Sequence, residues 1–501
     1  MSTTIFLITK HTRPAPPPAA CRLRRAHADT TLLQVGKWHL GQNVLASLPT
    51  GRGFDSYLGY WSGAEDYYSH VCKAAYDFAD GTRTALKYNN TYSTPVFTQR
   101  VVDIVSAHAK DPALASTPWY MYLAFQNIHW PLEAPQNYID MYADIATGAQ
   151  KICGGCKSPK DGVKRQTIAA MIKIMDDGIG NITVALKSTN QYDDTFIVFS
   201  SDNGGPTHNN EGTQSNNYPL RGGKNTIWEG GTRLLGIVKG HKGSGIAVGQ
   251  NNYEMIHGTD WLPTIVTMAS GDDWHKLIPA NEPPQLLGDG MNVWPALVGK
   301  PSPRTEMVLE CHSQGQPQVH GNAFIMQQDN TEWKIIQNAN TNNEAGWYPP
   351  PAQNVNTTKY TVQCPGPKPS GPDSPGGYYA FNQSWTCRKA FCLFNVTIGA
   401  DTCEYHDLAA KHPDVVAKMV KRLKDYQATA VLAVTDKDGT VDCPDTPTCK
   451  KSKCEPVVDA AGAWRPCDSP SSHLLGRVAG DVDPWQASKP AESSTHVKNA
   501  T

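Results

Sequence analysis

The sequence lacks both a long apolar segment and an excess of charge of one sign. No run approaches the ~18 to 20 apolar residues of a membrane-spanning helix, and runs such as Phe196 to Phe199 have only the length of a strand. Lys and Arg total 45 against 46 Asp and Glu, for a net charge of -1. This balance excludes the broad basic field of a nucleic-acid or membrane-surface binder. We therefore expect no membrane span, no nucleic-acid partner, and small or neutral ligands.

Charged residues are also scarce, at 18% of the chain, whereas Gly (42) and Pro (37) are abundant. This composition excludes helical bundles and coiled coils and indicates many turns and long loops. The apolar stretch Ile5 to Ile8 is too short for a secretory signal. Thirteen cysteines nevertheless fit an oxidising compartment, and their odd number leaves at least one thiol free or paired between chains. Six Asn-x-Ser/Thr sequons also fit an oxidising compartment, at Asn89, Asn181, Asn356, Asn382, Asn395 and Asn499.

Shifts in composition divide the chain of 501 residues into four parts. Residues 1–28, with a Pro/Ala tract followed by clustered Arg, predict a disordered or miscalled leader. Residues 29–300 predict an α/β domain, and residues 301–440 a smaller α+β domain that includes a Pro- and Gly-rich loop from Tyr348 to Gly377. Residues 441–501 predict a Cys-rich, partly disordered tail.

Strands and a helix alternate within the first domain. Apolar runs bounded by polar residues predict buried strands at Thr30 to Val35, Trp119 to Phe125 and Thr195 to Ser200. Apolar residues at helical spacing predict a helix from Gln166 to Lys187, so strand, helix and strand follow one another as in a parallel sheet. The other expected elements are helices at Asp260 to Ala269 and Pro413 to Thr429, and strands at Ala323 to Gln327 and Trp333 to Gln337.

Polar clusters follow each of the three strands, where ligands bind in α/β sheets. Lys37 and His39 lie in Gly36 to Gly41, and His129 lies in the segment Gln126 to Pro131. Asp202 and Asn203 open a Gly-rich turn, and their oxygens suit Ca²⁺ or Mg²⁺. Taken singly, each cluster also fits a plain exposed loop, a structural histidine or a common turn.

A fourth segment, Arg221 to Arg233, sets Lys224 and flanking arginines among glycine pairs. A cation on flexible backbone can approach anionic oxygens closely. Two lysines, two histidines and a hard-metal pair at strand ends together predict a site for transfer of a tetrahedral anionic group.

In this order, five motifs resemble those of the sulfatases, and most of all the group of arylsulfatases B, I and J. They are GKWHLG (36–41), GFDSYLGY (53–60), HWPLEAP (129–135), SDNGG (201–205) and RGGKNTIWEGGTR (221–233). The resemblance extends from about residue 30 to 440 and includes DWLPT (260–264) and the EYHDL that ends at Leu408.

The resemblance implies an alkaline-phosphatase-like α/β fold, a mostly parallel sheet flanked by helices, with a smaller C-terminal α+β domain. It implies hydrolysis of sulfate esters of aryl or sugar substrates, around one Ca²⁺ ion, in a lysosomal or secreted protein. Family members attack sulfur with a hydrated formylglycine made from the Cys of a Cys-x-Pro-Ser-Arg motif. The motifs carry no indication of oligomeric state.

Matching the motifs residue by residue gives each candidate a role. Lys37 resembles the lysine that holds the nucleophile and a sulfate oxygen, and His39 the histidine that helps collapse the covalent sulfate intermediate. His129 and Lys224 resemble the pair on the sulfate and the leaving oxygen. Asp202 and Asn203 resemble two of the metal ligands. Fixed cations and a proton donor suit the negative charge that develops in this reaction.

The sequence departs from the family at its N-terminus. The family's nucleophile motif and Asp-Asp metal pair precede GKWHLG, but the 35 residues before Gly36 contain neither. Cys21, followed by Arg22 and Leu23, does not match the motif, and the mid-helix Asp176 and Asp177 do not replace the metal pair.

We therefore expect a chain that lacks roughly 100 family residues with the nucleophile and signal peptide, that is inactive as given and that has an incomplete Ca²⁺ site. The alternatives are a non-catalytic sulfatase-like protein that binds sulfated glycans, and a phosphoesterase of the same superfamily.

Overall fold

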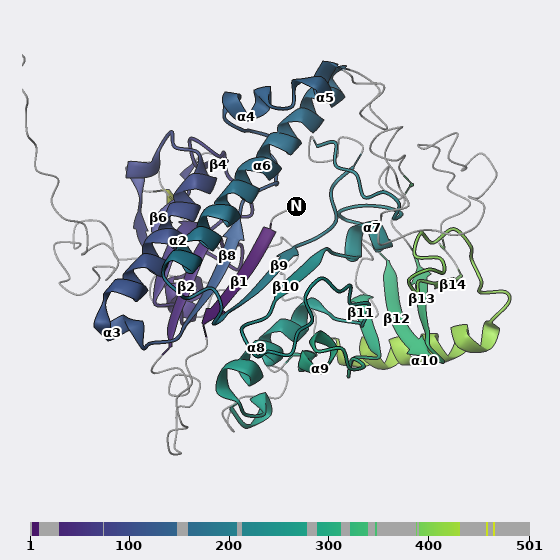
Figure 1. Cartoon of the computed structure of the whole chain (residues 1–501). Coiled ribbons are helices and arrows are strands. Elements are labelled where there is room, and N and C mark those ends of the chain that lie inside the picture. Colours follow the sequence, from purple (N-terminus) through teal and green to yellow (C-terminus); the bar gives the residue numbers. More distant parts are fainter. Residues whose placement is uncertain are drawn as a thin grey trace, which may run out of the picture.

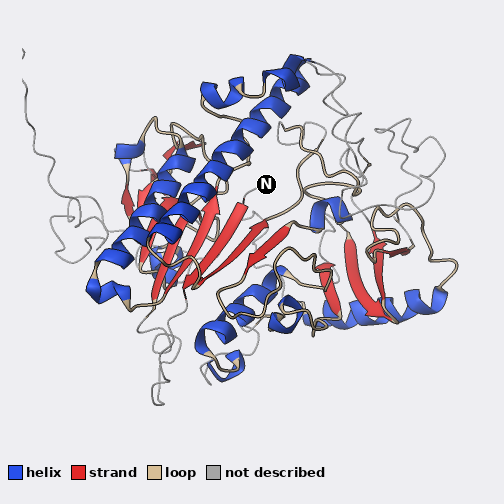
Figure 2. Cartoon of the chain, in the orientation of Figure 1, coloured by secondary structure: helices blue, strands red, loops and turns tan. Residues whose placement is uncertain are grey.

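The computed structural model describes residues 3–9, 30–73, 75–147, 159–207, 213–277, 288–311, 321–338, 346–347, 387, 390–430, 457–458 and 464–465. They form a large sheet covered by helices and a smaller sheet backed by one helix (Figures 1 and 2). The predicted α/β class with a smaller C-terminal unit is confirmed.

The large sheet has eight strands in the order β10-β9-β1-β8-β2-β3-β6-β7. Strand β2 pairs in parallel with β8 and β3, and β1 pairs antiparallel with β8 and β9. The sheet is therefore mixed, where the sequence predicted a mostly parallel one. The strands are β1 (Thr3–Thr9), β2 (Thr31–Lys37), β3 (Ser56–Tyr60), β6 (Ala79–Asp80), β7 (Arg83–Thr84), β8 (Trp119–Phe125), β9 (Thr195–Ser201) and β10 (Gly236–Lys239).

Strand β1 corrects the expectation of a disordered leader for Thr3–Thr9. It lies inside the sheet, with Ile5 opposite Leu123 of β8 and Phe199 of β9. Ile5 and Leu7 are buried at 3% and 2% exposure on one face of the sheet, and Ile8 is buried at 4% on the other, as expected for a strand with helices on both faces. The four apolar residues that were too few for a signal peptide suffice for a strand. Residues 10–28 lie outside the described residues.

Helices cover both faces of the large sheet (Figure 1). On one face, α2 (Ser93–Lys110) and α6 (Pro159–Ser188) bury Phe97, Val101 and Ile182 against β1, β2 and β8. On the other, α8 (Trp261–Ser270) and α9 (Trp294–Leu297) pack Ile265 and Leu297 on Phe196 and Val198 of β9. The helix predicted at Gln166 to Lys187 is the core of α6, and the one at Asp260 to Ala269 is α8.

The smaller sheet is antiparallel in the order β11-β12-β13-β14. Its strands are β11 (Glu306–Glu310), β12 (Asn322–Gln328), β13 (Thr331–Gln337) and β14 (Cys392–Asn395), and a disulfide joins Cys387 to Cys392. One face packs Phe324 and Ile335 on α10 (Pro413–Thr429). The opposite face packs Ile325 and Ile336 on Ile227 and Trp228. These two residues belong to the predicted segment Arg221 to Arg233, called the Lys224 segment below. The smaller sheet therefore directly supports part of the candidate site.

The remaining elements are short. They are β4 (Val71–Cys72), β5 (Ala75–Tyr76), β15 (Val457–Val458), β16 (Trp464–Arg465), α3 (Pro112–Ala115), α4 (Gln136–Asp140), α5 (Ala143–Thr147), α7 (Glu229–Thr232), η1 (Leu45–Ser47), η2 (Thr50–Arg52), η3 (Leu86–Tyr88), η5 (Gly258–Asp260) and η6 (Trp274–Leu277). None of the helices in the described ranges has the length and apolar character to cross a membrane. The predicted loop at 348–377 and most of the 441–501 tail lie outside those ranges, and the domain boundaries stay predictions.

Candidate active site

Lys37 and His39 lie where β2 ends. Lys37 is the last residue of the strand, and its carbonyl accepts a hydrogen bond from the Gln34 side chain at 2.9 Å. The next two residues continue to pair with the chain after β3, since Trp38 N donates to Tyr60 O and His39 N to Trp61 O, both at 3.0 Å. The buried Trp38 ring donates through Nε1 to two carbonyls, of Gly41 and Ser47. The backbone that carries both candidates is therefore fixed by the sheet.

Gly63 provides the space for the His39 imidazole. His39 has a left-handed backbone, with φ of 55°. A Cβ on Gly63 would lie 2.6 Å from both Cε1 and Nε2 of the His39 ring, closer than real contacts allow. The ring thus rests on bare backbone, and a glycine at position 63 is needed for this orientation.

His129 and Lys224 are in direct contact. His129 lies in the turn after β8, where its N–H donates to Gln126 O at 2.9 Å. Its Nδ1 lies 2.7 Å from Trp130 O, and its Nε2 lies 3.3 Å from Nζ of Lys224. A carbonyl only accepts, so Nδ1 carries the hydrogen and the neutral ring offers its Nε2 lone pair to the Lys224 ammonium.

Both histidines are biased toward their neutral forms. Burial, together with the charges of Lys37 and Lys224, lowers the pKa of His129 to about 4. Partial burial also lowers the pKa of His39, as do Lys37 and Lys224, while Asp202 opposes the shift. Each lysine therefore acts electrostatically on both histidines. The four predicted residues form one cluster at the carboxyl ends of β2 and β8.

The Lys224 segment folds back on itself and on the end of β9. Lys224 N donates to Gly205 O at 3.3 Å, and Gly204 N donates to Gly231 O at 3.0 Å. The Asn217 side chain accepts from Gly205 N and donates to Gly205 O and Gly222 O. Close backbone packing at Gly204, whose Cβ would meet Gly230 O at 1.7 Å, explains the glycine pairs.

Asp202 and Asn203 follow β9 as predicted, but they do not form a complete cation shell. Asp202 is exposed, and the Asn203 amide donates to Gly204 O at 2.8 Å. Within the described ranges, no three His, Cys, Asp or Glu residues gather in a way that could hold a metal ion. One carboxylate and one amide fall short of the six to eight oxygens that Ca²⁺ prefers, so Asp202 and Asn203 do not form a complete Ca²⁺ site by themselves.

Several supporting residues were not predicted from the sequence. Gly63 holds His39, and the Tyr67 hydroxyl donates to His129 O at 3.1 Å. Arg221 was among the cations of the predicted segment, but its buried guanidinium stacks between Trp228 and Trp347, 3.5 Å and 4.3 Å from their ring centroids. Trp347 lies 119 positions after Trp228 in the sequence, next to a Pro-rich stretch, so no local pattern links it to the segment 221–233.

The sequence model of the sulfatase family matches residues 23–271, which hold every predicted site residue. Arylsulfatase J of Mus musculus is 32% identical over 420 residues, which are 79% of this chain and 60% of that protein. The chain is a member of the sulfatase family. It spans 60% of the length of arylsulfatase J.

Other sulfatases match this sulfatase domain at lower identity. Human N-acetylgalactosamine-6-sulfatase is 24% identical over 276 residues, 53% of this chain and 45% of the relative. Among solved structures, Ps i-CgsB in complex with k-i-k-neocarrahexaose superposes with a TM-score of 0.55 at 21% identity, covering 81% of this chain and 72% of the other. The protein yidJ of Bacteroides fragilis gives 0.51 at 17%, with 81% and 76% covered. These structures support the sulfatase fold.

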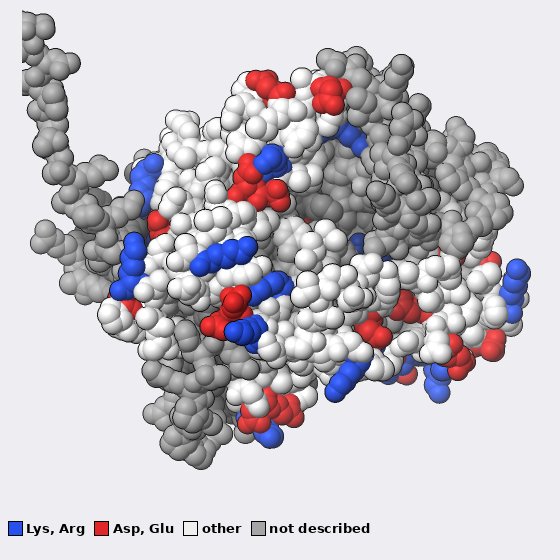
Figure 3. Space-filling view, in the orientation of Figure 1, with Lys and Arg blue, Asp and Glu red and all other residues white. Residues whose placement is uncertain are grey.

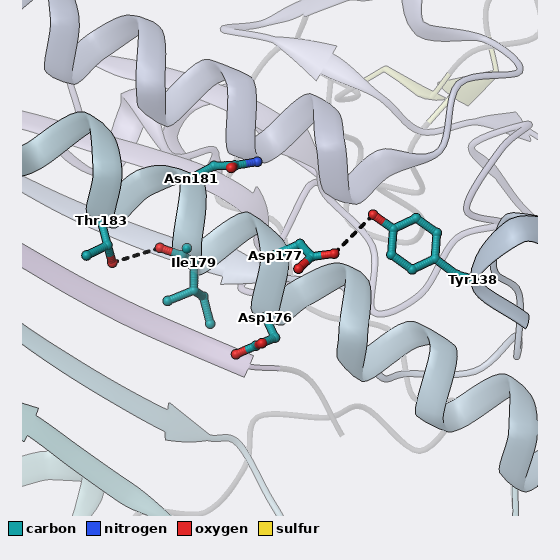
Figure 4. A pocket seen from close by; sticks show the side chains of 7 residues that line it. Tyr138, Asp176, Asp177, Ile179, Asn181 and Thr183 are labelled. Atoms are coloured by element: carbon teal, nitrogen blue, oxygen red, sulfur yellow. Dashed lines mark hydrogen bonds between the residues drawn. The ribbon is translucent and has the colours of Figure 1, made fainter. Parts of the chain in front are cut away.

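A separate pocket of about 620 Å³ lies on α6 of the sulfatase domain, against Tyr138 of α4 (Figure 4). Asp177 accepts a hydrogen bond from the Tyr138 hydroxyl at 3.2 Å and pairs with Lys173. Asp176 and Asp177 point in different directions from the helix. The interpretation of this pair as helix residues rather than metal ligands agrees with these contacts.

Charges of both signs are interspersed on the face of the molecule shown in Figure 3. Lys and Arg alternate there with Asp and Glu, without one broad basic field. This pattern is consistent with the balanced composition and with a small anionic ligand held by a few local cations.

Proposed function

We propose that the chain is an arylsulfatase-type sulfuric ester hydrolase whose described residues supply the cationic half of the active site. The substrate class is a sulfate ester of an aryl or sugar alcohol. By the same likeness, we propose a lysosomal or secreted location. The observation that carries the proposal is the Lys224–His129 contact at 3.3 Å, in a cluster where Lys37 also acts on both histidines.

The chemistry of the cluster supports this proposal. A sulfate monoester bears negative charge on its free oxygens, and charge grows on the leaving oxygen as the S–O bond breaks. Lys37 and Lys224 would hold these oxygens through charge-assisted hydrogen bonds. The neutral His129 would accept and return a proton at Nε2, next to the Lys224 ammonium that donates to it.

No Cys-x-Pro-Ser-Arg motif occurs in the 501 residues. We therefore propose that the chain as given binds sulfate esters without appreciable turnover, because fixed cations stabilise a transition state but do not replace a nucleophile. The same observation favours the alternative function, a non-catalytic sulfatase-like protein that binds sulfated glycans. For Ca²⁺ we propose one weak site at Asp202 and Asn203, completed by water.

Two measurements on the full chain test these functions. Calorimetry with inorganic sulfate and with a chromogenic aryl sulfate should show binding that weakens in Lys224→Met. Release of the chromophore would then distinguish hydrolysis from binding. Absence of any sulfate or sulfate-ester binding by the folded chain would overturn both functions.

A further inference from the structure

A buried ion cluster joins the smaller sheet to the Lys224 segment. Nζ of Lys334, on β13, lies 2.8 Å from Oε1 of Glu229 and 2.9 Å from Oε1 of Glu404. Oε2 of Glu404 accepts a hydrogen bond from Glu229 N at 2.9 Å, and Oε2 of Glu229 pairs with Nε of Arg233 at 2.5 Å. The Lys334 and Glu404 side chains are fully buried, and Glu229 is 2% exposed. Glu229 is therefore held through both its backbone and its carboxylate.

A buried ion cluster is not expected if the interface between the smaller sheet and the Lys224 segment served stability alone. Lys334 projects from the sheet face that carries Ile325 and Ile336, which pack on Ile227 and Trp228. Removing ions from water carries a penalty that their mutual attraction often fails to recover, and replacing buried ion pairs by apolar residues of similar volume is often neutral or stabilising. A charged group of this kind is stable only where it meets its partners, so the cluster favours the arrangement in which Lys334 lies between Glu229 and Glu404.

Electrostatics within the cluster favour the ionised form of its central carboxylate. Burial alone would raise the pKa of Glu229, but the charges of Lys334 and Arg233 outweigh burial and lower this pKa to about 2. Burial raises the pKa of Glu404 to about 7. Lys334 lies within 2.9 Å of both carboxylates, and its charge favours the ionised form of each. Through Glu229, which is part of α7, this contact reaches the segment that carries Lys224.

Glu229 is connected to Lys224 by tightly packed backbone. Gly230 N donates to Arg221 O at 2.6 Å, and Thr226 N donates to Gly223 O at 3.0 Å. A Cβ on Gly231 would lie 2.4 Å from Thr226 O and 2.5 Å from Gly223 O. Residues 221–226 therefore rest directly on the first turn of α7, and a shift of Glu229 must move the backbone that carries Lys224.

We propose that Lys334 is a positioning residue of the active site: by holding Glu229, it fixes the segment 221–233 so that Lys224 reaches His129. This proposal rests on the proposed function only for the role that the Lys224–His129 contact would have in binding a sulfate ester. The contact itself can be measured without substrate.

The test is the titration of His129 in the full chain by NMR of labelled histidine, with the signal assigned by its absence in His129→Gln. Lys334→Met removes the charge and keeps the length of the side chain. Withdrawal of Lys224 removes a cation that disfavours the imidazolium, so the pKa of His129 should rise. A unit charge at hydrogen-bond distance, even in a water-like dielectric, predicts a rise of about one unit. The pKa of His129 in Lys224→Met gives the rise expected when the Lys224 charge is lost completely.

Met419→Ala is the matched control for lost stability. Met419 is fully buried on α10, against the opposite face of the same sheet. It should lower the midpoint of thermal unfolding without changing the titration of His129. If Lys334→Met does not fold, Glu229→Gln tests the same connection and should shift His129 in the same direction.

An unchanged His129 titration in folded Lys334→Met, or in Glu229→Gln where that variant alone folds, would overturn the positioning role. A shifted titration in a chain that binds no sulfate ester would overturn the proposed function and leave the positioning role intact.

Discussion

Nζ of Lys224 lies 3.3 Å from Nε2 of His129, although 95 residues separate them in the chain. The two residues follow different strands of one sheet, and their contact closes the cationic cluster with Lys37 and His39. A lysine in this position faces whatever anionic group enters beside the histidine.

Lys224→Met should weaken binding of inorganic sulfate by roughly 10- to 100-fold, the worth of one hydrogen bond to a charged group. Calorimetry on the full chain measures this. Lys276→Met is the matched control, because Lys276 is exposed and forms a surface ion pair with Asp272. Equal losses in the two variants would mean that sulfate responds to net charge and not to this site.

Gly63→Ala should displace the His39 ring with little loss of stability. The added methyl would lie 2.6 Å from the ring, and an imidazole can rotate away whereas backbone cannot. The His39 NMR signals should therefore change while the free energy of unfolding falls by no more than about 1 kcal/mol. In Gly180→Ala, where nothing lies within 4 Å of the new methyl, the His39 signals should stay as they are. Unchanged His39 signals in Gly63→Ala would contradict the packing described.

Leu7→Ala should lower the free energy of unfolding by about 2 to 5 kcal/mol, the range for a buried leucine truncated to alanine. Leu7 is 2% exposed between β8 and β9. Denaturant unfolding measures the change, and Val184→Ala, at a side chain 64% exposed on α6, should change it by about 0.5 kcal/mol or less. A loss as small as that of Val184→Ala would show that β1 does not hold the sheet together.

The site and most elements were predictable because their signals are local. Strand β8 and helix α10 have the predicted bounds, since a run of apolar residues or a helical repeat identifies each. The cluster of Lys37, His39, His129 and Lys224 followed from polar residues at strand ends, and the structure brings all four together, although their catalytic roles stay predictions.

The features that were not predicted depend on contacts between residues distant in sequence. Strand β1 pairs with residues more than 110 positions away, and the short apolar run of Ile5 to Ile8 does not reveal them. Lys334 looks like the outward residue of a strand, and only its contacts with Glu229 and Glu404 show why it is buried. Tertiary pairing, which no local pattern encodes, decides both cases.

Ca²⁺ should bind weakly to the chain, with a dissociation constant well above the micromolar range that complete protein sites reach. Asp202 contributes one carboxylate, and no further His, Cys, Asp or Glu cluster in the described residues completes a shell. Calorimetry with Ca²⁺ in the absence of sulfate measures this. A stoichiometric site of micromolar or tighter affinity would contradict the incomplete shell.

The central claim is that Lys37, His39, His129 and Lys224 form the cationic half of a sulfatase site. Its most direct test is to replace residues 1–29 by a sulfatase N-terminal segment that carries its own strand, Asp-Asp pair and Cys-x-Pro-Ser-Arg motif, so that this strand takes the place of β1 between β8 and β9, and to measure hydrolysis of a chromogenic aryl sulfate. The account predicts that the joined chain gains turnover over the parent and loses on the order of 10²-fold or more of it in Lys224→Met, as expected for a group that stabilises the transition state. Turnover that is unaffected by Lys224→Met and His129→Gln, or a folded joined chain with no turnover at all, would contradict it.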